Sequence, residues 1–414
     1  MKKRHLWSVI TLLALGSAAF AFGPEDAYKY QDPRIPHLKT QLDAAARSLQ
    51  GAQSGLGGSL TLKPGYTVDF PDPGDTDETG FGLGGTKVEL FWGPDPVTIG
   101  RALRDLERSR RDYYRTVVGS TEGALIAHAR LLRFQNEVAQ REARLKASQA
   151  NLAELQKKPD TSADQLERAR GELSFRQLDL QRFQLELQQA RDVAASFGLS
   201  GDAEPRTLRF AIPQVRVEDT PAYRLALAEL QLARAEAQRE SLAYLNRLSL
   251  GVTYTGAQVE AGFNVGFARG VPSVGASAEL KTSTDTKVFI GLEANIPLEA
   301  FLGGSAQSAE ANVRLRELDL ESLRQGLAGQ LRALQASIAL AEQGLASAET
   351  ALANEARFLQ QSEADFKAGK ISEQEYLERL GDARAMADYA RAWEDYIRSV
   401  GDYLDLVGGT WQTR

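Results

Sequence analysis

The sequence predicts a mixed α/β membrane protein that is mainly helical and consists of two pseudo-repeats, each with long coiled-coil helices and a β-hairpin. Two observations lead to this prediction. The stretch LTLKPGYT at 60–67 returns as LSLGVTYT at 248–255, with four identical residues at a constant shift of 188. Both copies are flanked by long runs rich in Ala, Leu, Arg, Glu and Gln, a composition typical of long helices.

Composition and charge exclude several classes of protein. The chain has 414 residues, a formal net charge of −6 and no cysteine. An acidic chain lacks the basic surface that nucleic acid requires as a partner. Without cysteine there are no disulfides, no thiolate metal sites and no lipidated N-terminal cysteine. An exported protein of this size without disulfides suits a bacterial envelope.

The N-terminus has the three-part pattern of a secretory signal. Three basic residues at 2–4 precede an apolar run at 6–20, and Ala19-Phe20-Ala21 offers an A-x-A cleavage site. We therefore expect a signal peptide over 1–21, with an uncleaved anchor as the alternative. No internal stretch approaches the ~20 consecutive apolar residues of a spanning helix.

The first pseudo-repeat is predicted over 22–197. Strands at 59–70 and 81–92 flank an acidic turn, and a helical hairpin follows over 95–197. The hairpin is broken by Lys-Pro-Asp-Thr at 158–161, where a polar residue can cap the return helix.

A proline-bearing connector at 198–219 leads to the second pseudo-repeat, 220–409. Its predicted parts are a helix at 221–246, strands at 248–267 and 273–296, a helical hairpin at 304–407 and, beyond the repeat, a tail at 410–414. Apolar residues on the outgoing helix recur four and three apart, which predicts coiled-coil packing along one seam. The seam consists of Leu327, Leu331, Leu334, Ile338, Ala341, Leu345, Ala348 and Leu352.

The predicted helix lengths match one another. Each outgoing helix has roughly 60–65 residues, or about 90–100 Å at ~1.5 Å per residue. A return helix of about 36 residues stacked on a short helix of about 26 reaches the same length. We therefore expect a rod made of both pseudo-repeats.

The strands of the second repeat leave two possibilities open. The alternation of apolar residues is regular from Leu248 to Tyr254 but changes phase near 255–259. A bulge in one long strand would cause this change, and so would an extra turn. We prefer one long hairpin over two short ones.

The strand pattern favours a transmembrane barrel. One face alternates large apolar residues while the other carries Thr, Ser, Gly, Glu, Asn and Lys, as expected with lipid outside and water inside. Four strands cannot close a water-filled pore, so other copies of the chain must contribute, and three copies give twelve strands. The alternative is a soluble sheet packed on the helices.

Three segments carry a resemblance to a known family. They are TPAYRLALAELQLARAEAQRESLAYLNRLSLGVTYTG (220–256), VFIGLEANIPLEAFLGGSAQSAEANVRLREL (288–318) and FKAGKISEQEYLERLGDARAMADYARAWEDYIRSVGDYLDLVGG (366–409). Taken in order, they resemble the outer-membrane efflux protein family, the TolC family. The first repeat resembles it more loosely, since Lys158-Pro159-Asp160 stands where the family often has a glycine turn.

The resemblance implies a homotrimer in which a 12-stranded transmembrane β-barrel in the outer membrane joins a 12-helix α-barrel in the periplasm. It also implies two partners, a periplasmic adaptor protein and an inner-membrane transporter that supplies the energy. The chain itself would be a passive exit duct for efflux or type I secretion. A periplasmic coiled-coil adaptor and a structural spacer of the cell envelope remain the alternatives.

The same resemblance places the aperture and the adaptor-docking surface at the two helical turns. The residues concerned are Lys158, Pro159, Asp160, Thr161 and Asp164 in the first turn and Gly369, Lys370, Ile371, Ser372 and Glu373 in the second. The plainer interpretation is that Gly369 and Ser372 only cap helices. In three copies, Asp160, Asp164 and Glu373 would form an acidic mouth with a modest cation preference.

Aromatic residues on the strands are candidates for the membrane interface, namely Phe91, Trp92, Tyr66 and Tyr254. The alternative is ordinary packing between strands. We find no catalytic, metal-binding or cofactor-binding pattern: the three histidines are isolated, and no Ser/His/Asp order or zinc motif appears. The sequence does not name the exported substrate.

Overall fold

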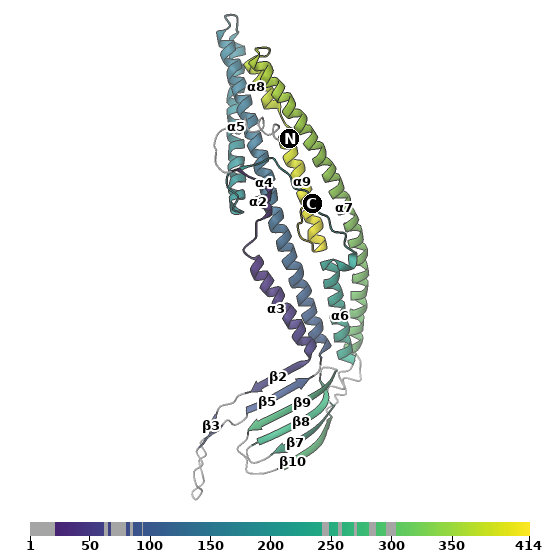
Figure 1. Cartoon of the computed structure of the whole chain (residues 1–414). Helices are drawn as coiled ribbons and strands as arrows, with labels where there is room; N and C mark the ends of the chain where they lie inside the picture. The colour runs from purple at the N-terminus through teal and green to yellow at the C-terminus, as the bar shows by residue number, and fades with distance from the viewer. Residues whose placement is uncertain are drawn as a thin grey trace. The chain divides into compact units, whose positions relative to one another are not determined.

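The structure is a computed structural model. It describes residues 21–61, 65–67, 80–82, 86–92, 94–241, 248–255, 259–268, 271–280, 287–294 and 304–414 (Figure 1). The chain forms two compact units, unit 1 (Met1–Ile35, Tyr114–Val215, Ala328–Arg414) and unit 2 (Pro36–Tyr113, Arg216–Leu327). The units interleave along the chain, so they do not coincide with the two pseudo-repeats. The predicted signal peptide lies almost wholly outside the described residues.

Long helices dominate unit 1. The two outgoing helices, which also extend into unit 2, are α4 (Pro96–Lys157, 62 residues) and α7 (Gly304–Lys367, 64 residues), close to the predicted lengths. Their return helices are α5 (Ala163–Ser196), α8 (Glu373–Asp382) and α9 (Ala385–Val407). The smaller elements of unit 1 are α2 (Pro24–Tyr28) and β1 (Ala21–Phe22), which pairs in parallel with β6 (Asp202–Ala203). The short 3-10 helix η2 (Val217–Asp219) lies at the beginning of the second segment of unit 2.

The helices of unit 1 follow one another side by side in the order α5, α4, α9, α7. An ion pair of 3.6 Å between Arg141 and Asp179 joins α4 to α5. Arg130 of α4 donates to Glu394 of α9 at 3.0 Å, and Glu355 of α7 accepts from the first amide of α9 at 2.9 Å. The order leaves α5 and α7 as two different edges of the row (Figure 1).

An aromatic cluster forms the core of unit 1 where the 198–219 connector crosses the helices. The Phe210 ring is fully buried, stacks on Trp393 and Tyr396, and meets Trp411 edge-on at 4.7 Å. Its backbone N–H donates to the Tyr396 hydroxyl at 3.0 Å. Large aromatic surfaces removed from water make this cluster the main hydrophobic anchor of the connector.

The predicted heptad seam on α7 is confirmed at its strongest positions. Leu327, Leu331, Ile338 and Leu345 are buried, and the remaining seam residues are half-buried. A seam spaced four and three apart stays on one side of a helix because ~3.6 residues make a turn.

The return helix of the second hairpin is not continuous. A single helix was expected from residue 372 to 407, but the structure ends α8 at Asp382 and starts α9 at Ala385. The carboxylate of Glu355 accepts from the backbone N–H groups of Arg384 and Ala385, both at 2.9 Å. A carboxylate at this position satisfies orphan amides at a helix start, which explains why the break is stable.

Unit 2 combines helices with a β-sheet. Its further helices are α3 (Ile35–Ser54) and α6 (Pro221–Ser241). The six-stranded antiparallel sheet has the order β10-β7-β8-β9-β5-β2, and β3 pairs separately with β4. The strands are β2 (Leu56–Thr61), β3 (Gly65–Thr67), β4 (Gly80–Gly82), β5 (Thr86–Trp92), β7 (Leu248–Thr255), β8 (Val259–Ala268), β9 (Val271–Leu280) and β10 (Lys287–Ala294).

The preference for one long hairpin over 248–296 is wrong. The region contains four strands, and β7 pairs antiparallel with β8 from Thr255↔Glu260 to Ser249↔Gly266. The change of phase near 255–259 therefore marks a reversal of the chain, the alternative left open, and not a bulge. In the described residues, one sheet has six strands instead of four and β3 and β4 pair separately, so the count of twelve for three copies no longer follows. Among the described residues, none of the helices is both long and apolar enough to cross a membrane.

Candidate functional site: two helical turns and the charged network of unit 1

The turn between α4 and α5 is fixed by local hydrogen bonds. The Thr161 hydroxyl donates to the Leu155 carbonyl at 2.7 Å. Ser162 and Gln165 form a reciprocal capping box at the start of α5, with distances of 3.2 and 3.0 Å. Lys158 pairs with Glu154 one helical turn back at 2.7 Å and holds the pKa of that carboxyl below its ordinary value. The turn is thus held by contacts within the chain.

The turn between α7 and α8 has a different construction. Gly369 adopts a left-handed conformation with φ 71°, which glycine reaches without a steric penalty. Its N–H donates to the Phe366 carbonyl and that of Lys370 to the Asp365 carbonyl, both at 2.9 Å, which is a Schellman motif. Ser372 then caps α8 by accepting from the Glu375 N–H at 3.1 Å. The capping roles of Gly369 and Ser372 are therefore present.

Both predicted turns lie at the same end of unit 1 (Figure 1). Within them Thr161 and Ile371 are half-buried, and the other predicted residues are exposed to solvent: Lys158, Pro159, Asp160, Asp164, Gly369, Lys370, Ser372 and Glu373. Lys370 pairs with Asp365 of α7 at 3.0 Å. Exposed polar turns on rigid helices form a surface that a partner can reach.

The four predicted interface aromatics lie on strands of unit 2. Tyr66 belongs to β3, while Phe91 and Trp92 end β5, but their side chains lie outside the described part of the chain. Tyr254 of β7 has its side chain described and is 48% exposed. The interface role of these residues remains a prediction.

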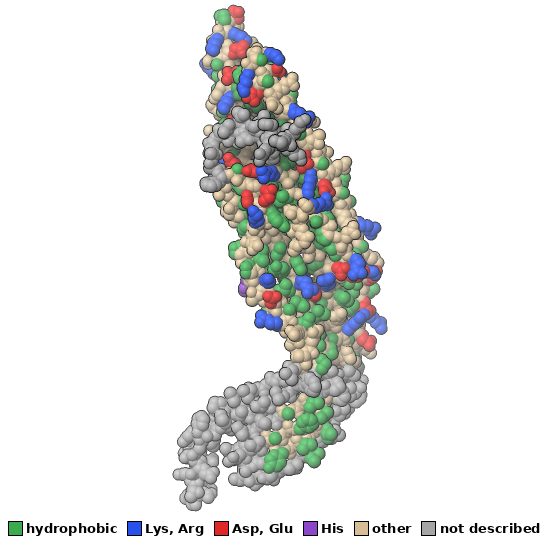
Figure 2. Space-filling view, in the orientation of Figure 1, with side chains coloured by type: hydrophobic (Ala, Val, Ile, Leu, Met, Phe, Trp, Pro, Cys, Tyr) green, Lys and Arg blue, Asp and Glu red, His purple; other side chains and the backbone are tan. Residues whose placement is uncertain are grey.

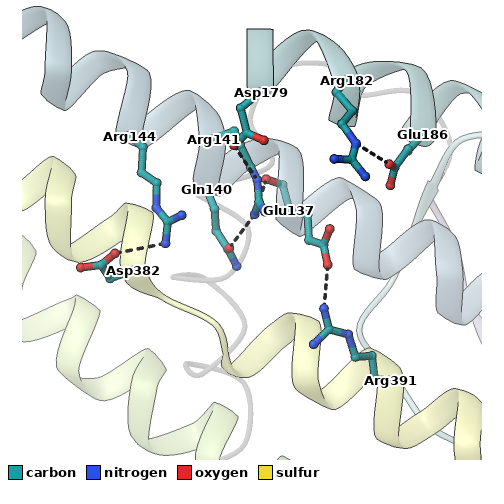
Figure 3. Close-up of polar contacts among 9 residues, drawn as sticks. All are labelled: Glu137, Gln140, Arg141, Arg144, Asp179, Arg182, Glu186, Asp382 and Arg391. Carbon is teal, nitrogen blue, oxygen red and sulfur yellow. Dashed lines mark hydrogen bonds and ion pairs between the residues drawn. The ribbon is translucent and has the colours of Figure 1, made fainter. Parts of the chain in front are cut away.

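A charged network on α4 was not predicted from the sequence (Figure 3). Glu137 is 3% exposed and accepts from Arg133 at 3.0 Å and from Arg391 of α9 at 3.2 Å. A buried carboxylate is tolerated only when it is paired, because removing one partner leaves an uncompensated charge. Glu137 therefore fixes the register between α4 and α9.

Arg141 and Arg144 extend this network to α5 and α8. The Arg141 guanidinium lies 3.8 Å from the centroid of the Phe183 ring on α5. It also lies 3.6 Å from Asp179 of the same helix (Figure 3). Burial lowers the pKa of Arg141, an effect that Glu137 and Asp179 oppose. Arg144 reaches Asp382, the last residue of α8, at 3.1 Å. The network thus holds three helices to α4 just below the turns.

The sequence carries no clear signal for these pairs. Glu137 and Arg141 are four residues apart, a spacing equally typical of solvated ion pairs on a helix surface. Only their burial, which depends on the packing of α5, α8 and α9, distinguishes the two situations.

Two further titratable groups of α4 are perturbed. Burial raises the pKa of Glu122 to about 7, assisted by Asp402 and Asp405 of α9 and opposed by Arg398. Burial lowers the pKa of His128 to about 4, although its Nε2 lies 3.1 Å from the Glu204 carbonyl oxygen. His128 is packed edge-on against Phe22, as expected of a core residue. Within the described residues, no group of three or more His, Asp or Glu side chains could hold a metal ion.

The row of long helices and the antiparallel sheet are similar to those of solved outer-membrane channels. This likeness confirms, for the fold, the resemblance predicted from the sequence. Three solved structures illustrate the likeness. The Campylobacter jejuni outer-membrane channel CmeC has a TM-score of 0.57 and 13% identity, over 94% of this chain and 85% of CmeC.

The outer-membrane channel OprN has a TM-score of 0.55 and 16% identity, over 94% of this chain and 89% of OprN. CusC, whose structures concern folding and transmembrane channel formation, has a TM-score of 0.52 and 13% identity, over 97% of this chain and 92% of CusC. No family model and no curated protein sequence matches the chain.

Proposed function

We propose that this chain is an outer-membrane exit duct, a passive conduit that several copies form together. The proposal rests on the two ends of the helical row and the two ends of the sheet, because in each case the two ends are formed by different elements. The helical row ends in α5 and α7, and the sheet ends in β10 and β2. A contact between unlike edges is heterologous, and heterologous contacts form a ring when the rotation closes.

The outer face of α5 supports this assembly. Four large apolar side chains on it are exposed, and they recur at spacings of three, seven and eight: Phe175, Leu178, Leu185 and Val193. With ~3.6 residues per turn these spacings fall on one side of a helix. The buried residues of α5, such as Ala169 and Leu187, occupy the opposite side. Another copy would remove the exposed stripe from water.

The outer face of α7 is complementary in size. Leu340 and Phe358 are exposed on it. Other exposed residues on the same side are small and follow a heptad spacing: Gly329, Ala333, Ala336, Gly344, Ser347 and Ala351. A Cβ atom added at Gly329 or Gly344 would meet nothing within 4 Å in the described part of the chain. Small residues let a second helix approach closely. We infer that α5 of one copy packs on α7 of the next, so that three copies give twelve helices.

The sheet supports insertion into lipid. On β7, β8, β9 and β10, large apolar side chains are 41–70% exposed: Leu250, Val252, Tyr254, Phe263, Val265, Val274 and Ile290. Figure 2 shows hydrophobic side chains gathered on the described part of the sheet. A monomeric soluble protein rarely leaves such a continuous apolar patch in water. In the proposed duct this face contacts the outer membrane, and the helices lie in the periplasm.

The two turns are the proposed aperture and docking surface. Exposed polar residues there would meet a periplasmic adaptor, which in turn would recruit an inner-membrane transporter of an efflux or type I secretion system. In the ring, Asp160, Asp164 and Glu373 would line an acidic mouth with a modest preference for cations. The transporter supplies the energy, and the duct contributes an insulated path.

The proposal is tested with protein extracted from outer membranes in mild detergent. We expect an oligomer band that collapses to the monomer on heating, together with stepwise conductance in planar bilayers. Cation selectivity should weaken in Asp160→Asn/Glu373→Gln. A soluble monomer without conductance would contradict the duct. That result would instead favour a periplasmic adaptor or spacer, which also uses coiled-coil hairpins.

A further inference from the structure

The six-stranded sheet contains a hairpin beyond the four strands that a repeated pair supplies. β8 and β9 pair with each other over ten residues, from Val259↔Leu280 to Ala268↔Val271. They lie between β7 and β5, so β7 of the second repeat is joined to β5 of the first repeat by hydrogen bonds through β8 and β9. β9 continues onto β5 from Val274↔Trp92 to Leu280↔Thr86. The hairpin is therefore part of the sheet and not a loop attached to its rim.

The exposed apolar face includes this hairpin. Ile290 of β10 opposes Val252 of β7, and Val252 opposes Phe263 of β8. Phe263 in turn opposes Ala276 of β9, and all four side chains are exposed. Directly opposed residues in an antiparallel ladder lie on the same face. A face that continues across β8 and β9 indicates that the same surroundings cover all these strands.

The two edges of the sheet are left without a neighbour among the described strands. Within the described residues, β10 pairs only with β7, and β2 pairs only with β5. Each neighbouring pair in the sheet is antiparallel, so with six strands the two edge strands run in opposite directions. A β10–β2 contact between copies would continue the antiparallel pattern without interruption.

We propose that each copy contributes six strands to the barrel and that β10 of one copy pairs with β2 of the next. The partner is a second copy of this chain, and the inference rests on the proposed duct. Three copies then close a barrel of eighteen strands. Barrels of 16–18 strands leave an aqueous channel, whereas about eight are filled by side chains.

The chain contains no cysteine, so engineered pairs can be read without background. Ser277→Cys/Glu89→Cys tests the β9–β5 contact, since these positions oppose each other. Thr253→Cys/Glu89→Cys tests the competing arrangement in which β7 pairs directly with β5 and the β8–β9 hairpin lies outside the barrel. Glu293→Cys combined in turn with Gly57→Cys, Ser59→Cys or Thr61→Cys tests β10 against β2 of the next copy at three registers.

All variants are oxidised in outer membranes, and thiols are counted after unfolding with a maleimide that shifts gel mobility. We expect the 277/89 pair to lose both thiols within one chain, and the 253/89 pair to keep both. At least one 293 combination should give covalent dimers and trimers. Reversed results for 277/89 and 253/89, or a 293 disulfide only within one chain, overturn the six-strand barrel.

The failure of this inference is distinguishable from failure of the duct. A heat-modifiable, conducting oligomer in which 277/89 stays reduced leaves the duct intact and removes only the extra hairpin from the barrel. If no 293 combination cross-links in such an oligomer, the β10–β2 junction is wrong. A soluble monomer overturns both proposals.

Discussion

Glu122 shows how one side chain couples unit 1 to pH. The carboxyl group lies against Gly401 of α9, so close that a Cβ atom there would clash with it. Burial, Asp402 and Asp405 raise its pKa to about 7, while Arg398 acts in the opposite direction. The folded state thus favours the protonated acid, and the unfolded chain ionises near the ordinary value of 4.5. The raised pKa of Glu122 therefore contributes its full amount to the free energy of unfolding below pH 4.5. This contribution is lost as pH rises through 7.

We therefore expect Glu122→Gln to flatten the pH dependence of the melting temperature. An amide is isosteric and uncharged, so the variant should melt higher than the unmodified protein at pH 8 and close to it at pH 5. Thermal unfolding followed by circular dichroism in detergent measures both. Glu167→Gln, at an exposed position of α5, is the control. An equal gain at both pH values would show that ionisation of Glu122 is not the cause.

Glu355 acts on a whole element. Its two carboxylate oxygens each accept one amide of the α8–α9 junction, at Arg384 and Ala385. Ala383, the residue before Arg384, has an extended backbone with ψ 111°. Because the first amides of a helix lack internal partners, this side chain substitutes for an N-cap. The position of the break in the return helix follows from this contact between helices.

Glu355→Ala should destabilise α9 at its start by about 1–2 kcal/mol, as loss of an N-cap does. Amide hydrogen exchange should accelerate at residues 384–388 and remain unchanged near Val400. Glu355→Gln keeps one carbonyl oxygen and should show a smaller effect. Glu310→Ala, at an exposed position of the same helix, should have no effect on these amides. Unaltered exchange in Glu355→Ala would mean that the junction is held by other contacts.

Local chemistry made the helices predictable, while long-range packing did not follow from the sequence. The turn after α7 is predictable from Gly369 and Ser372, because glycine favours the left-handed conformation and serine favours the N-cap position. The α8–α9 break depends on Glu355, some thirty residues away, and has no local marker. The split between β7 and β8 was visible only as a phase change, which a bulge produces equally well. The pairing of buried Glu137 likewise depends on another helix, because Arg391 belongs to α9.

At the scale of the whole molecule, the proposed assembly depends on the outer faces of α5 and α7. Gly344→Leu places a large side chain on the small-residue face of α7, where the single chain has open space. Leucine also favours a helix more than glycine by roughly 0.5–1 kcal/mol, so folding of one copy should not suffer. Leu185→Asp puts a charge on the large-residue face of α5, which is 67% exposed at this position.

We expect both variants to lose most of the heat-modifiable oligomer while keeping their helical circular dichroism. The controls are Gln335→Leu on α7 and Gln184→Asp on α5, exposed positions away from the two stripes. Light scattering in detergent gives the molar mass of each variant. If the two stripe variants assemble as well as the controls, then α5 and α7 do not meet between copies.

The C-terminal tail forms hydrogen bonds with three segments of unit 1 that are far apart in the sequence. The Trp411 indole N–H donates to the Val118 carbonyl at 3.0 Å, and the Trp411 carbonyl accepts from the Tyr28 hydroxyl, 383 residues away. Ala211 N–H donates to the Gln412 carbonyl at 2.7 Å, and Arg414 N–H to the Arg209 carbonyl at 2.8 Å.

These contacts have a kinetic consequence. Contacts between residues far apart in the chain form slowly, because the entropy of closing the loop is lost before the contact stabilises anything. We therefore expect the aromatic core around Phe210 to be completed late in folding, because Trp411 must first reach Phe210, about 200 residues earlier in the chain.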